Sequence, residues 1–120
     1  MTESQLEKRL WFSLSCSDIV WRKPKKHTYA MVVVEQGKRH RITLPPDADD
    51  DYLVRTLLHE LLHVTIPGEL SAFGVFEEPI LERVLEPLMV DYLLRHPKKH
   101  EKWLAAIRKA REASSGRPGT

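Results

Sequence analysis

The chain has 120 residues, of which 42% are hydrophobic and 30% charged, and its formal net charge is +2. This composition is too apolar for general disorder and fits one globular domain, which we place at residues 1–112, followed by a disordered tail at residues 113–120. The single cysteine, Cys16, excludes an intrachain disulfide. No segment approaches the roughly 18 uninterrupted apolar residues of a membrane span, and no signal-peptide cleavage site is clear, so we expect a cytoplasmic protein without a membrane contact.

Charge is distributed unevenly along the chain. Residues 1–41 carry nine Lys and Arg against four Asp and Glu, residues 42–90 carry two against ten, and residues 91–120 carry eight against three. Basic ends can contact nucleic acid, but no block here reaches five consecutive like charges. We therefore interpret the basic ends mainly as solvated helix faces.

The N-terminal part is predicted to form a helix and strands. Apolar residues at helical spacing, behind a capping threonine or serine, predict a helix over residues 3–15. Two β-rich runs at residues 28–35 and 39–44 flank Gly37, which is typical of an antiparallel hairpin. Residues 18–22 are a candidate third strand.

The rest of the chain is predicted to be helical apart from one loop. A helix is expected from about residue 51 to 65, because the acidic DADDD precedes it and Pro67-Gly68 ends it. After a mixed loop, Pro79 opens a second long helix, in which Pro87 predicts a kink or a break. A last helix is expected over residues 97–112. The predicted fold class is α+β, with an N-terminal helix, a small antiparallel β-hairpin or sheet, a central helix and two C-terminal helices.

The central helix contains the stretch TLLHELLHVTIPG at residues 56–68. Helical residues four apart lie on one face at about 5–6 Å, so His59 and His63 can turn their rings toward one point, and a tetrahedral zinc accepts two such nitrogens. Glu60 lies about 100° around the helix from His59, where it can take a proton from metal-activated water without binding the metal. The pattern therefore predicts a zinc site.

The alternative interpretation is a leucine-rich core helix that carries two histidines and a glutamate by chance. However, the leucines bury this helix on several sides, and semi-buried imidazoles need polar partners, which a metal ion would supply. The position of the motif between an acidic cap and a helix-ending Pro-Gly also favours the metal interpretation.

A catalytic zinc keeps three protein ligands, so a third must come from further along the chain. The metzincin pattern requires glycine at position 66 and histidine at position 69, and here Ile66 and Glu69 stand there. In the stretch FEEPILERVLE, Glu78 lies near the centre of the apolar face of the second helix and is the first candidate. Glu82 and Glu86 are predicted mainly to be solvated or capping carboxylates. The other candidate ligands are Glu77, Glu82 and Glu69.

The residues His59-Glu60-Leu61-Leu62-His63, followed by a glutamate on the next helix, resemble the gluzincin pattern of zinc metallopeptidases. The wider arrangement is similar to small metallopeptidase-like proteins encoded by phages and prophages. The matching segments are RHRITL at residues 39–44, TLLHELLH at 56–63, EEP at 77–79 and HP at 96–97. The similarity spans most of residues 28–107.

This resemblance implies a minimal zincin-like fold and zinc-dependent hydrolysis of peptide bonds. One Zn²⁺ would be held by His59, His63 and Glu78, with Glu60 as general base and then proton donor. A peptide or protein substrate would lie extended along the edge of the strand at 28–35 or 39–44. By residue type alone, the candidates for stabilising an oxyanion are Tyr92, His96 and His100.

Two other functions stay open at this point. A SprT-like protease acting near DNA would take its third ligand from His96 or His100 and contact phosphates through basic residues near the C-terminus. These basic residues are Lys98, Lys99, Lys102, Arg108, Lys109 and Arg111. A non-catalytic, phage-type regulatory or binding protein would instead use the hairpin edge or an apolar interface. That interface would include Trp103, Leu104 and Ile107.

Overall fold

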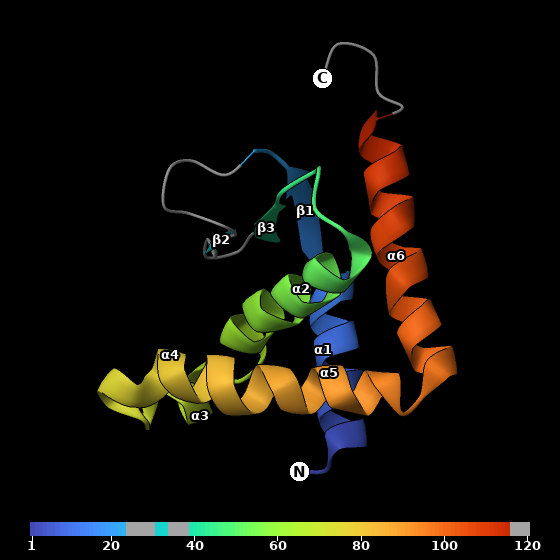
Figure 1. Cartoon of the computed structure of the whole chain (residues 1–120). Coiled ribbons are helices and arrows are strands. Elements are labelled where there is room, and N and C mark those ends of the chain that lie inside the picture. The colour runs from blue at the N-terminus through green and yellow to red at the C-terminus, as the bar shows by residue number, and fades with distance from the viewer. Residues whose placement is uncertain (24–30, 34–38, 116–120) are drawn as a thin grey trace.

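The computed structural model describes residues 1–23, 31–33 and 39–115, which are mostly helical (Figure 1). The first helix, α1 (Glu3–Ser15), spans the residues that the sequence predicts. The hydroxyl of Thr2 accepts a hydrogen bond from the Gln5 amide at 3.1 Å, and the Gln5 side chain accepts one from the Thr2 amide at 2.8 Å. This capping box satisfies two backbone donors that would otherwise lack partners at the helix start.

The sheet consists of three short strands in the order β1-β3-β2. The strands are β1 (Ser17–Trp21), β2 (Met31–Val33) and β3 (His40–Leu44). The central strand, β3, runs parallel to β1, with Ser17 opposite His40. On its other side β3 pairs antiparallel with β2. Candidate strand 18–22 is thus confirmed as β1, and β3 has partners on both sides.

The predicted α+β fold with a small antiparallel hairpin or sheet is wrong. The described residues are mainly helical, and the pairing between the two longest strands, β1 and β3, is parallel. A parallel pair joins segments far apart in the sequence, so no local turn signal predicts it. The structure retains the antiparallel pairing of β2 with β3. The predicted turn at residues 36–38 lies outside the described residues.

The motif helix, α2 (Asp50–Thr65), agrees closely with the predicted helix. Asp49 is its N-cap, and its carboxylate accepts a hydrogen bond from the Tyr52 amide at 2.8 Å. Acidic residues in the first turn also stabilise the helix, because their negative charges lie near the positive end of the helix dipole. The helix ends before Pro67, whose nitrogen carries no hydrogen to continue the bonding pattern.

The segment after α2 is more helical than the predicted loop. A short helix, α3 (Pro67–Ser71), and a 3-10 turn, η1 (Gly74–Phe76), occupy it. Gly74 adopts a φ of 56°, the left-handed conformation that favours glycine.

The predicted second long helix is continuous but irregular. It consists of α4 (Glu77–Ile80), a π-helical turn η2 (Leu81–Leu85) and α5 (Glu86–Leu94), so the irregularity falls just before Pro87. The last helix, α6 (Pro97–Ser115), extends beyond its predicted end at residue 112. Residues 116–120 of the predicted tail lie outside the described part of the chain.

Helix α2 lies at the centre of the molecule, between the sheet and α5, and packs also against α1 and α6 (Figure 1). Its leucines are fully buried in the core. They are Leu53, Leu57, Leu58, Leu61 and Leu62. Burial of each such side chain contributes about 1.5–3 kcal/mol, so the motif helix is held firmly on several sides. No helix within the described residues is long and apolar enough to cross a membrane.

Candidate metal centre

His59 and His63 lie on the least buried stripe of α2, because the leucines turn the other faces toward the core. The side chain of His59 is 16% exposed and that of His63 is 24% exposed. Their ring centroids are 5.1 Å apart. The prediction that both rings share one face of the helix is therefore confirmed.

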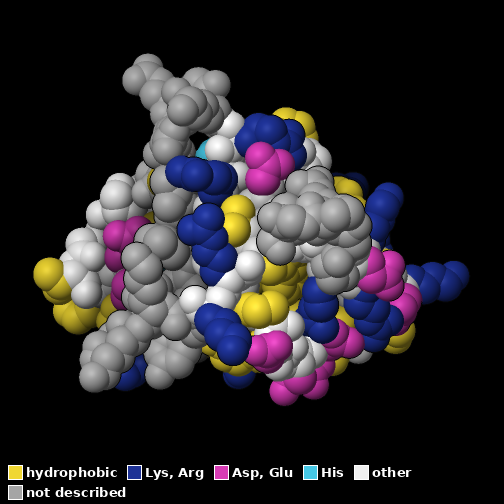
Figure 2. Space-filling model, turned by 90° about the horizontal axis from the view of Figure 1, so that it is seen from above, with side chains coloured by type: hydrophobic (Ala, Val, Ile, Leu, Met, Phe, Trp, Pro, Cys, Tyr) yellow, Lys and Arg dark blue, Asp and Glu magenta, His cyan; other side chains and the backbone are white. Residues whose placement is uncertain are grey.

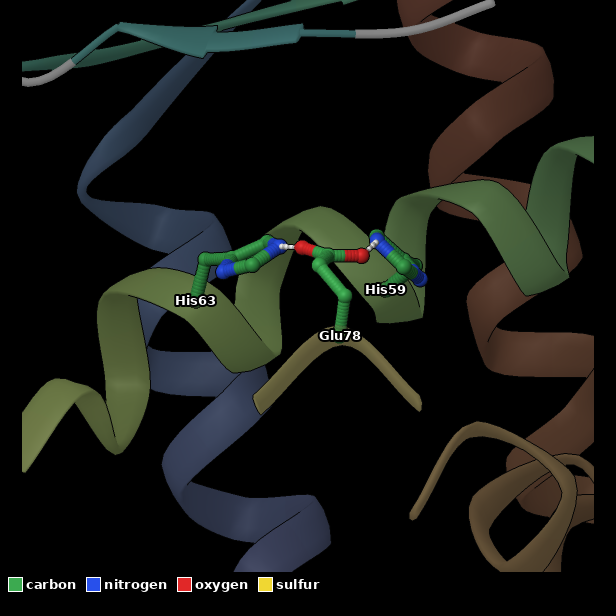
Figure 3. Close-up of side chains that lie close together, drawn as sticks. All are labelled: His59, His63 and Glu78. Carbon is green, nitrogen blue, oxygen red and sulfur yellow. Dashed lines mark ion pairs between the residues drawn. The ribbon is translucent and has the colours of Figure 1, made fainter. Parts of the chain in front are cut away.

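Glu78 reaches from α4 to a position between the two rings (Figure 3). Its Oε1 lies 2.7 Å from Nε2 of His63, and its Oε2 lies 3.4 Å from Nε2 of His59. One potential ligand atom from each of these three residues lies within 4.8 Å of the others. The structure thus brings the first candidate for the third ligand to both histidines.

The geometry of this cluster fits a zinc ion. Two imidazole nitrogens and a carboxylate oxygen are donors that zinc accepts. Around a tetrahedral zinc with bonds of about 2.0–2.2 Å, ligand atoms lie about 3.3–3.6 Å apart. In the structure the 3.4 Å contact with His59 is made by Oε2 of Glu78 and the 2.7 Å contact with His63 by Oε1. One ligand atom from each residue lies within 4.8 Å of the others, so side-chain rotations are needed to bring three donors to these distances around one ion. A zinc held by these three residues leaves its fourth position for water or substrate.

Glu60, the predicted general base, follows His59 on α2 and is buried, with 8% of its surface exposed. It is not one of the three grouped residues. A general base is not itself a metal ligand, so the role of Glu60 as the base stays a prediction.

The other glutamates considered as third ligands do not join the group found among the described residues. Glu77 Oε1 lies 4.0 Å from Nδ1 of His63, which is too far for a hydrogen bond. Glu82 and Glu69 are exposed, as Glu78 is, but they are not grouped with the two histidines among the described residues. Among the four candidates, Glu78 alone contacts both histidines in the part of the chain that the structure describes.

Glu86 is the residue of this region that sequence reasoning missed. It was predicted to be solvated or capping, but its side chain is only 13% exposed. Its Oε2 lies 2.9 Å from Nδ1 of His59, and its Oε1 lies 3.5 Å from Nε of Arg55. The available signal was Pro87, because a proline inside a helix disturbs the turn before it, and this disturbance changes which face Glu86 occupies.

The residues considered for an oxyanion site make contacts with residues outside the cluster. The Tyr92 hydroxyl accepts a hydrogen bond from Nζ of Lys99 at 2.5 Å, and this bond lowers the pKa of Tyr92 below its ordinary value. Nδ1 of His96 lies 2.8 Å from the backbone oxygen of Tyr92, and the two rings are in contact. His100 lines a separate cleft of about 270 Å³ beside Arg55. Neither His96 nor His100 belongs to the cluster that includes His59.

Several basic residues near the C-terminus pair with carboxylates. Arg108 Nη2 lies 2.9 Å from Oδ2 of Asp50, and Lys99 and Lys102 lie 3.5 and 3.9 Å from the Glu7 carboxylate. On the face shown in Figure 2, Lys and Arg side chains lie among Asp and Glu side chains. These pairings reduce the positive charge that the C-terminal helix offers to a phosphate backbone.

The apolar residues considered for an interface are part of the core. Trp103, Leu104 and Ile107 are all buried. The Trp103 ring also makes an edge-to-face contact with Trp11 at 5.1 Å between centroids. The prediction that these side chains offer a binding surface is wrong, because they fix α6 against the rest of the molecule.

Comparison with known proteins gives no family to which this chain can be assigned: no family model, curated protein or solved structure matches it. The function of the protein is therefore inferred from the side chains of the cluster.

Proposed function

We propose that this protein is a zinc-dependent metallopeptidase-like hydrolase. His59, His63 and Glu78 hold one zinc ion, and Glu60 is the general base. The observation that carries the proposal is the convergence of Glu78, from α4, on both histidines of α2 (Figure 3). A chance HExxH string would account for the two histidines on one helix but not for one carboxylate from another helix in contact with both of them.

Zinc at this position would supply a Lewis acid that polarises a carbonyl and lowers the pKa of water toward neutrality. The residues of the chain would transfer the protons and hold the reacting groups in position. Glu60 accepts the proton of the attacking water and returns it to the leaving amine. The buried leucines behind α2 keep the two histidines and Glu60 in a fixed relative orientation, which such proton transfers require.

The substrate that this arrangement favours is an extended peptide. The strand at residues 39–44 was one candidate for the substrate-binding edge, but β3 is paired on both sides and offers no edge. β2 is the outer strand of the described sheet on that side and packs against α2. A peptide that pairs with β2 through backbone hydrogen bonds would run alongside the motif helix. We propose an intracellular place for this activity, with which the single cysteine, Cys16, is compatible because it calls for no oxidising compartment.

The SprT-like alternative is less well supported. It requires His96 or His100 as third ligand, and neither belongs to the cluster of described residues that contains His59. The carboxylate of Glu78 contacts both histidines instead, which supports Glu78 as the third ligand.

The test is a Glu60→Gln variant assayed on a mixture of unstructured peptides, with zinc content measured on the same sample. We expect the variant to keep stoichiometric zinc and to lose hydrolysis by a factor of about 10²–10⁴, because it keeps the ligands and loses the base. Glu69→Gln is the matched control, since it makes the same change on an exposed glutamate of α3. Undiminished turnover by Glu60→Gln would remove Glu60 as the base.

A further inference from the structure

The imidazole of His59 is contacted by a carboxylate on each side. Nε2 faces Oε2 of Glu78 at 3.4 Å, and Nδ1 lies 2.9 Å from Oε2 of Glu86. An ionised carboxylate can only accept hydrogen bonds, so Nδ1 must carry the hydrogen. A neutral imidazole with its hydrogen on Nδ1 has its lone pair on Nε2, the atom that faces the proposed metal position.

Arg55 holds the other end of Glu86. Its Nε lies 3.5 Å from Oε1 of Glu86, and it stands one helical turn before His59 on α2. The guanidinium balances the charge of a carboxylate that is only 13% exposed. With one oxygen toward Arg55, the other oxygen is left pointing at Nδ1 of His59.

The π-helical turn explains why Glu86 faces α2. A regular α-helix from Glu78 to Glu86 would rotate by about 800°, about 80° beyond two full turns. In η2 the backbone N–H of Glu86 bonds to the carbonyl of Leu81, five residues earlier. Residues in such a turn advance by only about 80° each, so Glu78 and Glu86 end close to two full turns apart, on the same face.

Among the described ion pairs, none gives His63 an equivalent carboxylate contact at Nδ1. The carboxylate nearest its Nδ1 among the described ion pairs is Glu77, at 4.0 Å, beyond hydrogen-bond distance. Within the described residues the two histidines therefore differ, since carboxylates lie within 3.5 Å of both nitrogens of His59 but of Nε2 alone in His63.

We propose that Glu86, held by Arg55, is a positioning residue that fixes the tautomer and orientation of His59 for metal binding, an inference that rests on the proposed zinc site. Carboxylates that accept the free N–H of a ligating histidine typically change metal affinity by about 10–100-fold when removed. The same range is expected here.

The test has two readings on wild type, Glu86→Ala and Glu86→Gln. The first is the long-range ¹H–¹⁵N spectrum of the His59 ring in metal-free protein, which distinguishes the Nδ1–H form from the Nε2–H form. We expect the Nδ1–H form in wild type, a shift toward the Nε2–H form in Glu86→Ala, and an intermediate result in Glu86→Gln, which keeps an acceptor oxygen. The second is the zinc dissociation constant, expected to weaken by about 10–100-fold in Glu86→Ala.

Glu82→Ala is the matched control, because it removes an exposed glutamate from η2 and should change neither reading. Glu86→Gln keeps the size of the side chain and serves if Glu86→Ala does not fold. The proposal is overturned if His59 carries its hydrogen on Nε2 in the wild-type protein. It is also overturned if folded variants of Glu86 bind zinc as tightly as the wild-type protein does. If wild type has Nδ1–H His59 but binds no zinc, the proposed function fails while the contact is upheld, so the two failures are distinguishable.

Discussion

The carboxylate of Glu78 lies 2.7 Å from Nε2 of His63 and connects α4 to the motif helix α2. The two histidines come together through helix geometry alone, whereas Glu78 arrives only when the chain has folded back after α3. A substitution at Glu78 therefore tests the ligand that the tertiary fold brings to the proposed site, separately from the two histidines that helix α2 itself brings together.

Glu78→Ala should weaken zinc binding by more than the roughly 10–100-fold typical of removing a carboxylate that only supports a ligating histidine. The reason is that one of three donors is lost. Zinc titration of the purified variant measures the effect. Glu77→Ala is the control, since Glu77 lies 4.0 Å from His63 and should leave affinity close to wild type. Equal effects of the two substitutions would contradict the assignment of Glu78.

Zinc should stabilise the folded protein. An ion that binds the native state and not the unfolded chain adds about 2.7 kcal/mol to the free energy of unfolding at a hundredfold excess over its dissociation constant. Thermal unfolding with added zinc and then with a chelator measures this shift and its reversal. The stabilisation should vanish in His63→Ala, which lacks one ligand. A melting temperature that rises equally in that variant would show that zinc acts elsewhere.

Lys99→Met should lower the melting temperature, because it removes the nearer of two ammonium groups that lie beside the Glu7 carboxylate. Glu7 is buried, with 2% of its surface exposed, and among the described ion pairs the variant leaves it the longer 3.9 Å contact with Lys102. Loss of the Lys99 hydrogen bond should also raise the pKa of Tyr92 toward its ordinary value, so the alkaline absorbance change moves to higher pH. Lys98→Met, at the neighbouring exposed position, should produce neither change.

Asp49→Ala should cost about 0.5–2 kcal/mol of folding free energy, because it removes the side chain that caps α2. Denaturant unfolding measures the loss. Asp47→Ala, on the exposed segment before the cap, is the control. The zinc affinity of folded Asp49→Ala should stay at the wild-type value, since the ligands lie further along the helix. A large loss of zinc affinity would mean that the helix start is coupled to the site.

The parts of the molecule that were predictable from sequence depend on short-range rules. Thr2 and Asp49 cap helices where local hydrogen bonding allows it, and the four-residue spacing of His59 and His63 fixes their shared face. The parallel pairing of β1 with β3 was not predicted, because it joins strands that are distant in the sequence and therefore leaves no local sequence signal.

Glu86 shows a different limit. Pro87 indicated that the second long helix was irregular, but a proline can be accommodated by a kink, a break or a π turn, and the choice depends on packing around the helix. The assumption of a regular helix placed Glu86 away from α2. In the structure Glu86 contacts His59.

The measurement that tests the central claim most directly is a crystal structure of the zinc-treated protein with anomalous data at the zinc edge. We predict one zinc ion per chain, within about 2.0–2.2 Å of Nε2 of His59, Nε2 of His63 and a carboxylate oxygen of Glu78. An anomalous peak bound by other residues, or no peak at the two histidines of α2, would contradict the account.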